Sequence, residues 1–546
     1  MESNLSRKDF LKASMLAGMG VLGAGSLAAC APQGESASGA GAANAEGVAW
    51  DQEVDVLVVG SGTGTMAAAA AKDAGAENVL ILEKSEFWGG TSATSGGGFY
   101  VPMNYVAKEQ GIEDNREDAV KYIMACSDGR AERKLVETYV DNANPFLEWA
   151  RDTFKWTWGF TSGTMFQDYY EPYEGYRAFG RGSVSMVDED RTQTPWGKLQ
   201  GIVKDMGIEV QMKTAAERLV TDADGAVVGV VTDGGKYIYA KTCVVLATGG
   251  FDHNPAMVKQ NLPFPIYVTD AAAGNTGDGQ AMGAEVGAHL AYMDGSWGVP
   301  CYLPGPFDPS QEMKQDIAGN DWGLYRGCPN SIIVNKYGKR FANESMAYAP
   351  FNRTFGQWDS GKLEYANIPA FFICDSEFTT YYALPGQKKP GDPLPEMVVR
   401  ADTLEELAGK LGIDPVGLVT EVEAFNVEAE AGTDSKFHRG ERAYDAAIPE
   451  LMSGGARTLA NIALGPVAKG PFYGILCLPG MCGTNGGLHT NEHAQVLKPN
   501  GEPIPGLLAV GNCAASIFGG AYAGGGTTLG SGSIMGWLGV RHALGE

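Results

Sequence analysis

Residues 54–84 read VDVLVVGSGTGTMAAAAAKDAGAENVLILEK, and this stretch decides the fold. Its first seven residues form an apolar run, which is typical of a parallel strand buried on both faces. A glycine-rich turn follows, then an alanine-rich segment over 66–74 that predicts a helix, and an apolar run over 79–84 that predicts the next strand. A strand, a glycine turn, a helix and a strand in this order indicate a Rossmann-like α/β fold.

The turn and the end of the second predicted strand carry residues suited to a dinucleotide. Gly60 permits the tight turn, Gly62 lets the backbone approach a pyrophosphate, and the helix N-terminus offers amide donors with a positive dipole. Glu83 comes 23 residues after Gly60, where an acid binds the ribose hydroxyls. Thr65 stands at the position of the third small residue of the GxGxxG pattern. Together these features predict a dinucleotide site.

Later segments make a flavin the expected dinucleotide. The acid is followed by KSEFWGGTSATSGGGFYVP over 84–102, a glycine- and hydroxyl-rich segment that suits a flavin laid along the backbone. KTCVVLATGGF over 241–251 and GLLAVGNC over 506–513 each run a predicted strand into a glycine turn, and GNTGDGQAMG over 274–283 adds a polar turn entering a helix. GGGTTLGSGSIMGWLGVRHA over 524–543 is expected to begin a helix whose amides meet the flavin ring.

On these motifs the sequence resembles the fumarate reductase and 3-ketosteroid dehydrogenase flavoprotein superfamily over nearly its whole length. The resemblance implies a discontinuous FAD-binding domain over 50–290 and 466–546, with an inserted α+β substrate domain, or cap, over 291–465. Members with covalent flavin have a histidine in the turn after the ribose acid, whereas residues 88–91 read WGGT here, so noncovalent FAD is expected. The implied cofactor-binding residues are Gly60, Ser61, Gly62, Gly64, Thr65, Glu83, Lys84, Gly90, Thr91, Ser92, Ser95, Gly97, Gly98, Ala216, Thr248, Gly249, Asp278, Gly511, Asn512 and Leu529.

Three positions separate the branches of this superfamily. In the fumarate-reducing branch an arginine just beyond a GKRFxNE-like motif delivers the proton, and GKRFANESMAY places Tyr348 there in this chain. Cys482 or Gly483 stands at the position of a clamp histidine, and Ala523 at that of a second clamp arginine. A dicarboxylate would meet no fixed cation, and burying two unpaired carboxylates costs several kcal/mol. The resemblance therefore disfavours fumarate as the substrate.

The ketosteroid branch fits the chain better. Tyr169 in FQDYYEP and Tyr348 in NESMAY match its first and second active-site tyrosines. Tyr522 and Gly526 in AYAGGG match its carbonyl-binding tyrosine and glycine, although two small residues replace the prolines of the usual YPGPG pattern. GTNGGLHTNEHAQVLKPNGEPIPGLLAVGN and FHRGERAYD are also similar to that branch. The resemblance thus implies Tyr169, Tyr348, Tyr522 and Gly526 as the catalytic residues.

The implied chemistry is coherent. Removing hydrogen from two adjacent carbons beside a carbonyl needs an oxyanion site, a base for the acidic α-proton and a hydride acceptor. In this interpretation the Tyr522 hydroxyl and the Gly526 amide hold the carbonyl oxygen, and flavin N5 takes the hydride. Tyr348 takes the α-proton, helped by a hydrogen bond from Tyr169, because a phenol with a pKa of about 10 is a poor base unless its anion is stabilised. Run backwards, the same groups reduce an enone.

The expected function is therefore the interconversion of a 3-ketosteroid, or a similar bulky cyclic ketone, with its ring-unsaturated enone. The residues leave the direction open between a dehydrogenase and an exported enone reductase. One alternative is an exported flavin reductase of a small unsaturated acid such as urocanate, cinnamate or fumarate, with Arg353 or Arg177 as the cation. The other is a noncatalytic flavin electron-transfer lipoprotein, which would have no use for the three tyrosines together.

The N-terminus predicts export. LSRKDFLK over 5–12 precedes an apolar stretch over 15–29 that is shorter than the roughly 20 residues needed to span a bilayer. Residues 1–30 are therefore expected to be an export signal. The signal resembles a twin-arginine (Tat) signal, with Lys8 in place of the second arginine.

The end of the predicted signal indicates a lipid anchor. LAAC over 27–30 resembles the cleavage box of a bacterial lipoprotein, in which Cys30 would be acylated, and ordinary cleavage is the alternative. Residues 31–49 are small and polar, as in a flexible tether. The expected location is periplasmic or cell-surface, with the membrane reached only through the anchor. A separate redox carrier, a quinone or a cytochrome, would then exchange electrons with the flavin.

Composition excludes other classes of protein. The chain has 41 Lys and Arg against 65 Asp and Glu, so its net charge of −24 repels nucleic-acid phosphates. Its nine cysteines include no CxxC pair and its six histidines no HExxH pattern. Neither a nucleic-acid partner nor a metal site is therefore expected.

Overall fold

The predicted strand, turn, helix and strand are present in the computed structural model, which describes residues 41–546 except 161–167, 188–194, 316–323 and 454–456. These elements are β2 (Gln52–Val59), α2 (Gly64–Asp73) and β3 (Val79–Glu83). The predicted export signal, Cys30 and the first part of the tether lie outside the described residues.

β2 lies inside a nine-stranded sheet, here called the cofactor sheet, with the order β1-β8-β9-β10-β2-β3-β7. β23 pairs with β10, and β22 with β23. The pairs β10/β2, β2/β3, β3/β7 and β10/β23 are parallel, so the carboxyl ends of these strands meet at one edge. The further strands are β1 (Ala43–Asn44), β7 (Glu209–Met212), β8 (Ala216–Thr221), β9 (Val227–Thr232), β10 (Tyr237–Leu246), β22 (Gln495–Leu497) and β23 (Pro503–Ala509).

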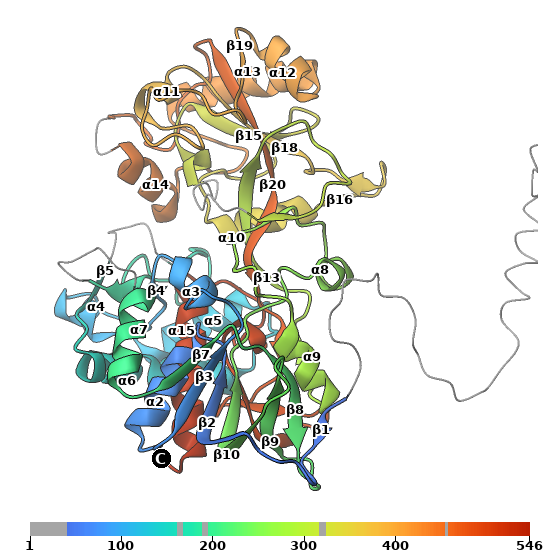
Figure 1. The fold of residues 1–546 in the computed structure, drawn as a ribbon. Coiled ribbons are helices and arrows are strands. Elements are labelled where there is room, and N and C mark those ends of the chain that lie inside the picture. The colour runs from blue at the N-terminus through green and yellow to red at the C-terminus, as the bar shows by residue number, and fades with distance from the viewer. Residues whose placement is uncertain (1–40, 161–167, 188–194, 316–323, 454–456) are drawn as a thin grey trace, which may run out of the picture. The chain divides into compact units, whose positions relative to one another are not determined.

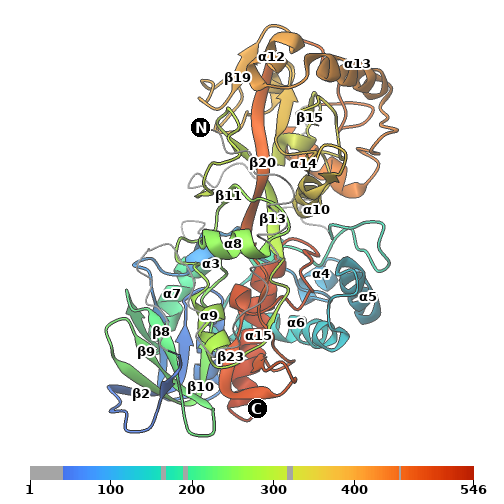
Figure 2. The same ribbon diagram turned by 90° about the vertical axis from the view of Figure 1, so that its right-hand side faces the viewer.

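The cofactor sheet is buried on both faces, as the apolar run predicts. Val56 and Val58 are fully buried and share a hydrophobic core with residues of α2 and α15 (Thr527–Ala543). Leu57 points to the other face, where it shares a core with Met282 of α9 (Asp278–Glu285). Figures 1 and 2 show α15 beside this sheet. The expected Rossmann-like α/β fold is confirmed.

A largely helical segment, from α3 to α7, follows β3 along the chain. Its three-stranded sheet has the order β4-β6-β5. Helix α6 packs against α5 and α15. The elements are α3 (Gly90–Thr94), β4 (Gly98–Phe99), α4 (Tyr105–Glu109), α5 (Arg116–Cys126), α6 (Arg133–Phe154), β5 (Trp158–Phe160), β6 (Val184–Met186) and α7 (Pro195–Asp205).

A second, seven-stranded sheet, here called the cap sheet, is built around the long strand β20 (Phe472–Thr484), which Figure 2 shows clearly. β20 pairs with β11, β13, β18 and β19. β20 lies in the segment 466–546 that was predicted to bind FAD, and yet it is the central strand of the cap sheet. The predicted domain boundaries stay predictions. The other strands are β11 (Val268–Thr269), β13 (Ser296–Leu303), β14 (Lys314–Gln315), β15 (Ser331–Asn335), β18 (Ala370–Cys374) and β19 (Val399–Ala401).

The remaining elements are short or lie around the cap sheet. The helices are α8 (Pro255–Asn261), α10 (Tyr348–Arg353), α11 (Phe378–Tyr381), α12 (Leu404–Leu411), α13 (Pro415–Ala431) and α14 (Ala443–Ser453), with 3₁₀ turns η1 (Leu324–Gly327), η2 (Thr354–Gly356) and η3 (Gly511–Cys513). Two small ribbons pair β12 (Leu290–Ala291) with β21 (Gly487–Leu488) and β16 (Trp358–Asp359) with β17 (Glu364–Tyr365).

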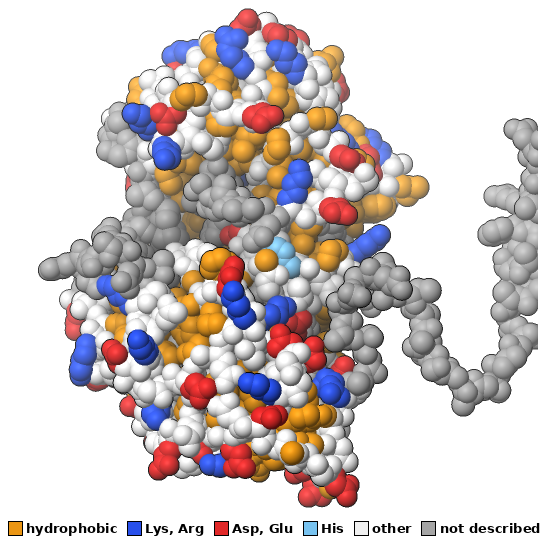
Figure 3. Space-filling model, in the orientation of Figure 1, with side chains coloured by type: hydrophobic (Ala, Val, Ile, Leu, Met, Phe, Trp, Pro, Cys, Tyr) orange, Lys and Arg blue, Asp and Glu red, His pale blue; other side chains and the backbone are white. Residues whose placement is uncertain are grey.

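The surface in Figure 3 carries basic and acidic side chains interspersed with apolar ones. Within the described part of the chain, no helix has both the length and the apolar character needed to cross a bilayer. The same residues form no cluster of three or more His, Cys, Asp or Glu that would hold a metal ion.

Candidate active site

The turn between β2 and α2 has no room for a side chain at Gly60 or at Gly64. Gly60 has a φ of +108°, and a Cβ there would lie 2.3 Å from the carbonyl oxygen of Ala247. A Cβ on Gly64 would lie 2.6 Å from the Ala247 Cβ. Thr65 Oγ1 donates to the carbonyl oxygen of Ser61 at 2.6 Å. Gly64 and Thr65 therefore hold α2 against the sheet.

The acid at the end of β3 shapes the same turn. Glu83 is buried, and its Oε2 accepts hydrogen bonds from the Ser61 N–H at 3.0 Å and the Ser61 hydroxyl at 2.5 Å. Its Oε1 accepts from the Ser85 N–H at 2.8 Å. The Ser61 hydroxyl in turn accepts from the Gly89 N–H at 2.8 Å, which joins the two glycine-rich turns. The predicted ribose acid thus also orders the loops around it.

A cavity of about 770 Å³ opens at the carboxyl ends of β2, β3 and β10. Every predicted cofactor residue except Gly64 and Thr65 lines it, and so do three of the four predicted catalytic residues. These are Gly60, Ser61, Gly62, Glu83, Lys84, Gly90, Thr91, Ser92, Ser95, Gly97, Gly98, Ala216, Thr248, Gly249, Asp278, Gly511, Asn512 and Leu529, with Tyr348, Tyr522 and Gly526. One cavity is therefore lined both by predicted cofactor residues and, at the end that we call the catalytic end, by three predicted catalytic residues.

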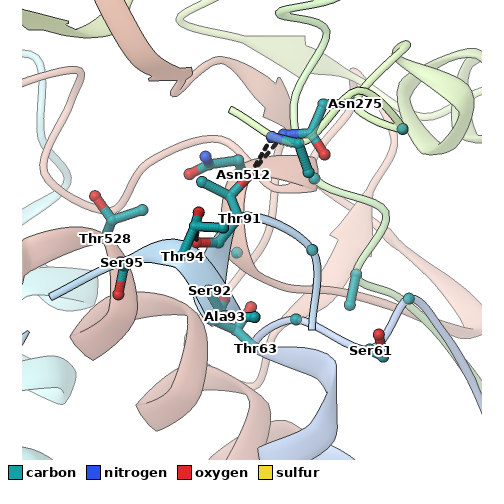
Figure 4. Close-up of a pocket in the computed structure, with 18 of the residues that line it drawn as sticks. Ser61, Thr63, Thr91, Ser92, Ala93, Thr94, Ser95, Asn275, Asn512 and Thr528 are labelled. Atoms are coloured by element: carbon teal, nitrogen blue, oxygen red, sulfur yellow. Dashed lines mark hydrogen bonds between the residues drawn. The ribbon is translucent and has the colours of Figure 1, made fainter. Parts of the chain in front are cut away.

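Several lining residues were not predicted from the sequence, and Asn275 is the clearest. Its side-chain amide donates to Thr91 Oγ1 at 3.2 Å and to Asp252 Oδ2 at 2.9 Å, and the Ala272 N–H donates to the same Thr91 oxygen at 2.9 Å (Figure 4). Burial raises the pKa of Asp252. The polar turn over 274–283 contains Asn275, but only the fold brings it to Thr91.

The cavity wall fits FAD. The glycines of the turn leave room for a pyrophosphate, and the hydroxyl side chains in Figure 4, such as Ser61, Thr63 and Ser92, surround the space beside the N-terminus of α2. Lys84 Nζ lies 2.8 Å from Asp278 Oδ2, so that this cation is already paired. Thr63 and Thr528 add hydroxyls that the sequence motifs do not identify.

Three tyrosines meet at the catalytic end. The Tyr169 hydroxyl donates a hydrogen bond to the Tyr348 hydroxyl at 2.7 Å. The ring of Tyr522 lies edge-on to both, with centroids 5.5 Å from each. All three are buried, and Tyr169 stands behind Tyr348, outside the lining of the cavity. The structure thus brings together three residues that the resemblance predicts as partners.

Burial keeps these phenols protonated. It raises the pKa of Tyr348 well above the ordinary value of 10, and a negative charge on Tyr169 or Tyr522 would raise it further. Burial likewise raises the pKa of Tyr169 and of Tyr522. Tyr444, whose ring centroid lies 5.6 Å from that of Tyr169, has its pKa raised to about 12 by burial. At neutral pH the cluster is uncharged.

A buried ion cluster fixes the loop that carries Tyr169. Asp168 accepts hydrogen bonds from Tyr100 at 2.8 Å and from Arg181 at 2.9 Å, and Arg181 also pairs with Asp114 at 2.6 Å. Burial raises the pKa of Asp168 to about 7, against the opposing charge of Arg181. The Tyr169 N–H donates to the carbonyl oxygen of Ala523 at 3.0 Å. The Tyr169 loop is thereby held against the loop of Tyr522.

Gly526 caps α15 at the cavity. It has a φ of +92°, and a Cβ there would lie 2.5 Å from the carbonyl carbon of Phe99, so no other residue fits. The Tyr100 N–H donates to the Gly526 carbonyl oxygen at 3.1 Å. Among the described residues, the Gly526 N–H donates to no protein acceptor. This amide, at the positive end of a 17-residue helix, suits an oxyanion.

A second buried ion cluster supports Tyr348, the first residue of α10. Glu344 accepts from Arg340 at 2.7 Å and from Arg439 at 3.3 Å, and Arg439 also donates to Ser345 Oγ at 3.2 Å. Burial alone would raise the pKa of Glu344, but the two guanidinium groups outweigh it and hold the pKa below its usual value. Residues from the GKRFANE and FHRGERAYD motifs therefore form a buried support for the loop that leads into Tyr348.

The arginines considered for a carboxylate substrate are engaged elsewhere. Arg177 donates to Asp118 Oδ2 at 2.5 Å, and Arg353 to Asp128 Oδ2 at 3.2 Å. Neither lines the cavity, whose cationic lining among the described residues is Lys84 alone. Cys482 lines the cavity at the clamp histidine position, and Ala523 is fully buried. The described residues supply no clamp for a dicarboxylate.

Comparison with known proteins gives consistent matches. The family model described as an FAD binding domain matches residues 55–529. The chain is 32% identical over 545 residues to 4-oxocyclohexanecarboxylate 2-dehydrogenase from Sinomonas cyclohexanicum, covering 90% of this chain and 93% of that relative. It is 31% identical over 571 residues to 3-oxosteroid 1-dehydrogenase from Mycolicibacterium smegmatis, covering 89% and 96%.

A solved structure extends this likeness to the fold. The crystal structure of 3-ketosteroid Δ1-dehydrogenase from Sterolibacterium denitrificans in complex with 1,4-androstadiene-3,17-dione superposes with a TM-score of 0.79. The two sequences are 28% identical, and the match covers 90% of this chain and 99% of that one.

The glycine turn yields a test of cofactor binding. Gly62→Val adds a branched side chain to the cavity wall, where even a Cβ would lie 3.3 Å from Ser92 Oγ. We expect the variant to remain colourless after reconstitution, because the valine occupies the space of the pyrophosphate. The wild-type protein should be yellow and should release FAD into the supernatant on heat denaturation, as measured by absorbance and chromatography.

The matched control for this test is Gly201→Val, since Gly201 lies on α7 with open space around its Cα. It should load FAD normally. A yellow Gly62→Val protein would contradict the predicted path of the cofactor, and wild-type flavin that stays with the precipitate would contradict noncovalent binding.

Proposed function

Because the chain belongs to the FAD binding domain family within the fumarate reductase and 3-ketosteroid dehydrogenase superfamily, we propose that it interconverts a 3-ketosteroid, or a similar bulky cyclic ketone, with its ring-unsaturated enone. The family and its relatives make the chain an FAD-dependent oxidoreductase acting on CH–CH bonds, with FAD held noncovalently. The proposal concerns the substrate and the residues that act on it.

The observation that carries the proposal is the buried hydrogen bond between Tyr169 and Tyr348 beside Tyr522. A proton-transfer group next to a neutral hydrogen-bond donor is what removal of an α-proton from a ketone requires. A noncatalytic electron carrier needs neither of these groups. A small unsaturated acid would need a cation, and the described lining of the catalytic end has none.

In this mechanism the chain's own residues control the carbonyl and the α-proton. The Tyr522 hydroxyl and the Gly526 N–H donate to the carbonyl oxygen and stabilise the negative charge that develops on it. Tyr348, as its phenolate, accepts the α-proton as the ring C=C bond forms and becomes a neutral phenol. The Tyr169 hydroxyl stabilises the phenolate before that transfer. When bound, FAD supplies the acceptor, or in reverse the donor, of the hydride at the β-carbon.

The same residues serve both directions. For enone reduction Tyr348 donates the proton, and its raised pKa keeps it protonated at neutral pH for that purpose. For dehydrogenation it must first lose its own proton, so alkaline conditions favour the reaction. We further propose that a separate carrier, a quinone or a cytochrome, exchanges electrons with the flavin.

The proposed function is tested anaerobically with the purified yellow protein. Saturated 3-ketosteroids should bleach the oxidised flavin, and enones should reoxidise dithionite-reduced protein, whereas urocanate and cinnamate should do neither. Tyr348→Phe should lower both rates by about 10² to 10⁴, because it removes the proton-transfer group and preserves the ring. Stopped-flow absorbance measures the rates, and flavin content and ligand affinity should stay near wild type.

Tyr237→Phe is the matched control, since Tyr237 lies at the start of β10, whereas the cavity opens beyond the end of that strand. Its rates should equal those of the wild type. Near-normal turnover in Tyr348→Phe would remove that residue from the chemistry. Reoxidation of the reduced flavin by the unsaturated acids alone would favour an acid reductase. No change in the flavin with any substrate would favour an electron carrier.

The Tyr169–Tyr348 hydrogen bond predicts a characteristic pH dependence. The phenolate of Tyr348 is the base in dehydrogenation, and its pKa is raised above 10, so the rate should rise with pH without reaching a plateau near neutrality. Tyr169→Phe removes a donor to that phenolate, raises its pKa further and lowers the rate about ten- to hundredfold at a given alkaline pH. Enone reduction should show little change between pH 6 and 8, because Tyr348 stays protonated there. A wild-type dehydrogenation plateau at neutral pH, or an unshifted profile in Tyr169→Phe, would contradict this role.

We propose, from the N-terminal sequence, that the protein is exported through a Tat-like signal and anchored by an acylated Cys30. Cys30→Ser should then move the protein from the membrane to the soluble exported fraction, because the acyl chains supply the anchor. Immunoblots of cell fractions measure the shift. Changing Arg7 and Lys8 to Gln together should leave the protein in the cytoplasm, and unchanged fractionation of Cys30→Ser would argue for ordinary cleavage.

A further inference from the structure

Trp297 of β13 is a buried side chain that the predicted site residues do not include. The pairing of β13 with β20 shifts register at this point, so that Cys482 and Gly483 of β20 both stand opposite Trp297. Bulges of this kind bend a strand and re-aim side chains, and they are frequent next to active sites. The Cys482 thiol, which lines the cavity, donates to the Trp297 carbonyl oxygen at 3.4 Å. The irregular pairing therefore places Trp297 directly behind the cavity wall.

The Trp297 side chain contacts two residues of that wall. Its indole N–H donates to Asn512 Oδ1 at 2.9 Å, and its ring lies edge-on to Tyr522 with the centroids 5.0 Å apart. Asn512, labelled in Figure 4, and Tyr522 both line the cavity, whereas Trp297 does not. One buried side chain thus contacts a predicted cofactor residue and a predicted catalytic residue.

The indole fixes the orientation of the Asn512 amide. An indole N–H can only donate, so the atom that faces it must be the amide oxygen, and the NH₂ group must point elsewhere. Gly483 leaves room for that group, since a Cβ there would lie 2.6 Å from Asn512 Nδ2. The backbone is held as well, because Gln280 Nε2 donates to the Asn512 carbonyl oxygen at 3.1 Å.

The NH₂ group of Asn512 is left available to a ligand. Asn512 Nδ2 has no protein acceptor among the described residues, and it is not one of their fully enclosed polar atoms. Because Asn512 lines the cavity, a bound molecule can supply the missing acceptor. FAD has carbonyl oxygens and ring nitrogens that accept hydrogen bonds, and the cavity wall fits FAD.

We propose that Trp297 is a positioning residue that holds the Asn512 amide with its NH₂ group toward the cavity, where the group donates to an acceptor atom of bound FAD. In the opposite orientation the amide oxygen would face those acceptors, and the buried indole N–H would lose its partner. The edge contact with Tyr522 holds the carbonyl-binding ring against the same side chain. This inference concerns the cofactor and is independent of the substrate.

The test measures the Kd of FAD for the purified FAD-loaded protein, from the fluorescence of flavin released on dilution. Trp297→Phe keeps an aromatic ring and removes the N–H, so we expect the Kd to rise about tenfold. Asn512→Ala should raise it by a similar factor. The double variant should be no more than about twofold weaker than Asn512→Ala, because the indole acts through the amide. A merely structural role of Trp297 would instead make the two losses multiply.

The matched control is Trp537→Phe. Trp537 is a buried residue of α15 whose indole N–H has no hydrogen-bond partner among the described residues, so its loss should leave the Kd unchanged. Asn512→Asp provides a second test that keeps an oxygen for the indole but replaces the donor by an acceptor. It should raise the Kd at least about tenfold, and it decides the matter if Trp297→Phe does not fold by circular dichroism.

Three results would overturn the proposal. These are an unchanged Kd in folded Trp297→Phe or in Asn512→Asp, fully multiplicative losses in the double variant, and an equal loss in Trp537→Phe. None of them bears on the proposed ketone chemistry, which is tested separately with the wild-type protein and Tyr348→Phe.

Discussion

One hydrogen bond of 2.7 Å, between the buried hydroxyls of Tyr169 and Tyr348, sets the requirement that the rest of the structure meets. Its partners are 179 residues apart in the sequence. A buried hydroxyl without a partner costs about 1–3 kcal/mol, so the two loops are stable only when they are brought into register with each other. The chain achieves this by fixing each loop separately.

Both loops are fixed by buried ions. Arg181 ties Asp168 to Asp114 beneath Tyr169, and Arg439 and Arg340 converge on Glu344 ahead of Tyr348. Removing such charges from water is costly, so these pairs add little net stability. They mainly orient the loops, because a bidentate guanidinium–carboxylate pair fixes directions that apolar packing leaves open. Neutral phenols that make few hydrogen bonds of their own thereby acquire defined positions. None of the residues of these two ion clusters lines the cavity, which the hydroxyl-bearing Tyr348 and Tyr522 do line.

The sequence predicts the parts of this arrangement that depend on local geometry. Gly60, Glu83 and the helix that begins after Gly526 follow from turn chemistry and strand patterns, and the three tyrosines follow from resemblance to a family. Asn275 escapes such reasoning, because its contact with Thr91 arises only when the polar turn lies beside Thr91 in the fold. Gly64 and Thr65 show a different limit of prediction from sequence, because a residue of a binding motif need not line the binding cavity. They belong to the predicted motif, and yet they pack α2 against the sheet and do not line the cavity.

In the proposed mechanism, the distribution of charge along the cavity explains why neutral donors act on the carbonyl oxygen. The described cation and its partner, Lys84 and Asp278, sit together at the cofactor end, so the described lining of the catalytic end has no cation. An enolate oxygen at that end cannot rely on a fixed cation. Its stabilisation falls to the Tyr522 hydroxyl and the Gly526 amide, whose dipoles are oriented by the fold and cost no reorganisation during the reaction. A cation in their place would bind carboxylates in the ground state, whereas these donors favour a ketone and strengthen as charge develops on its oxygen.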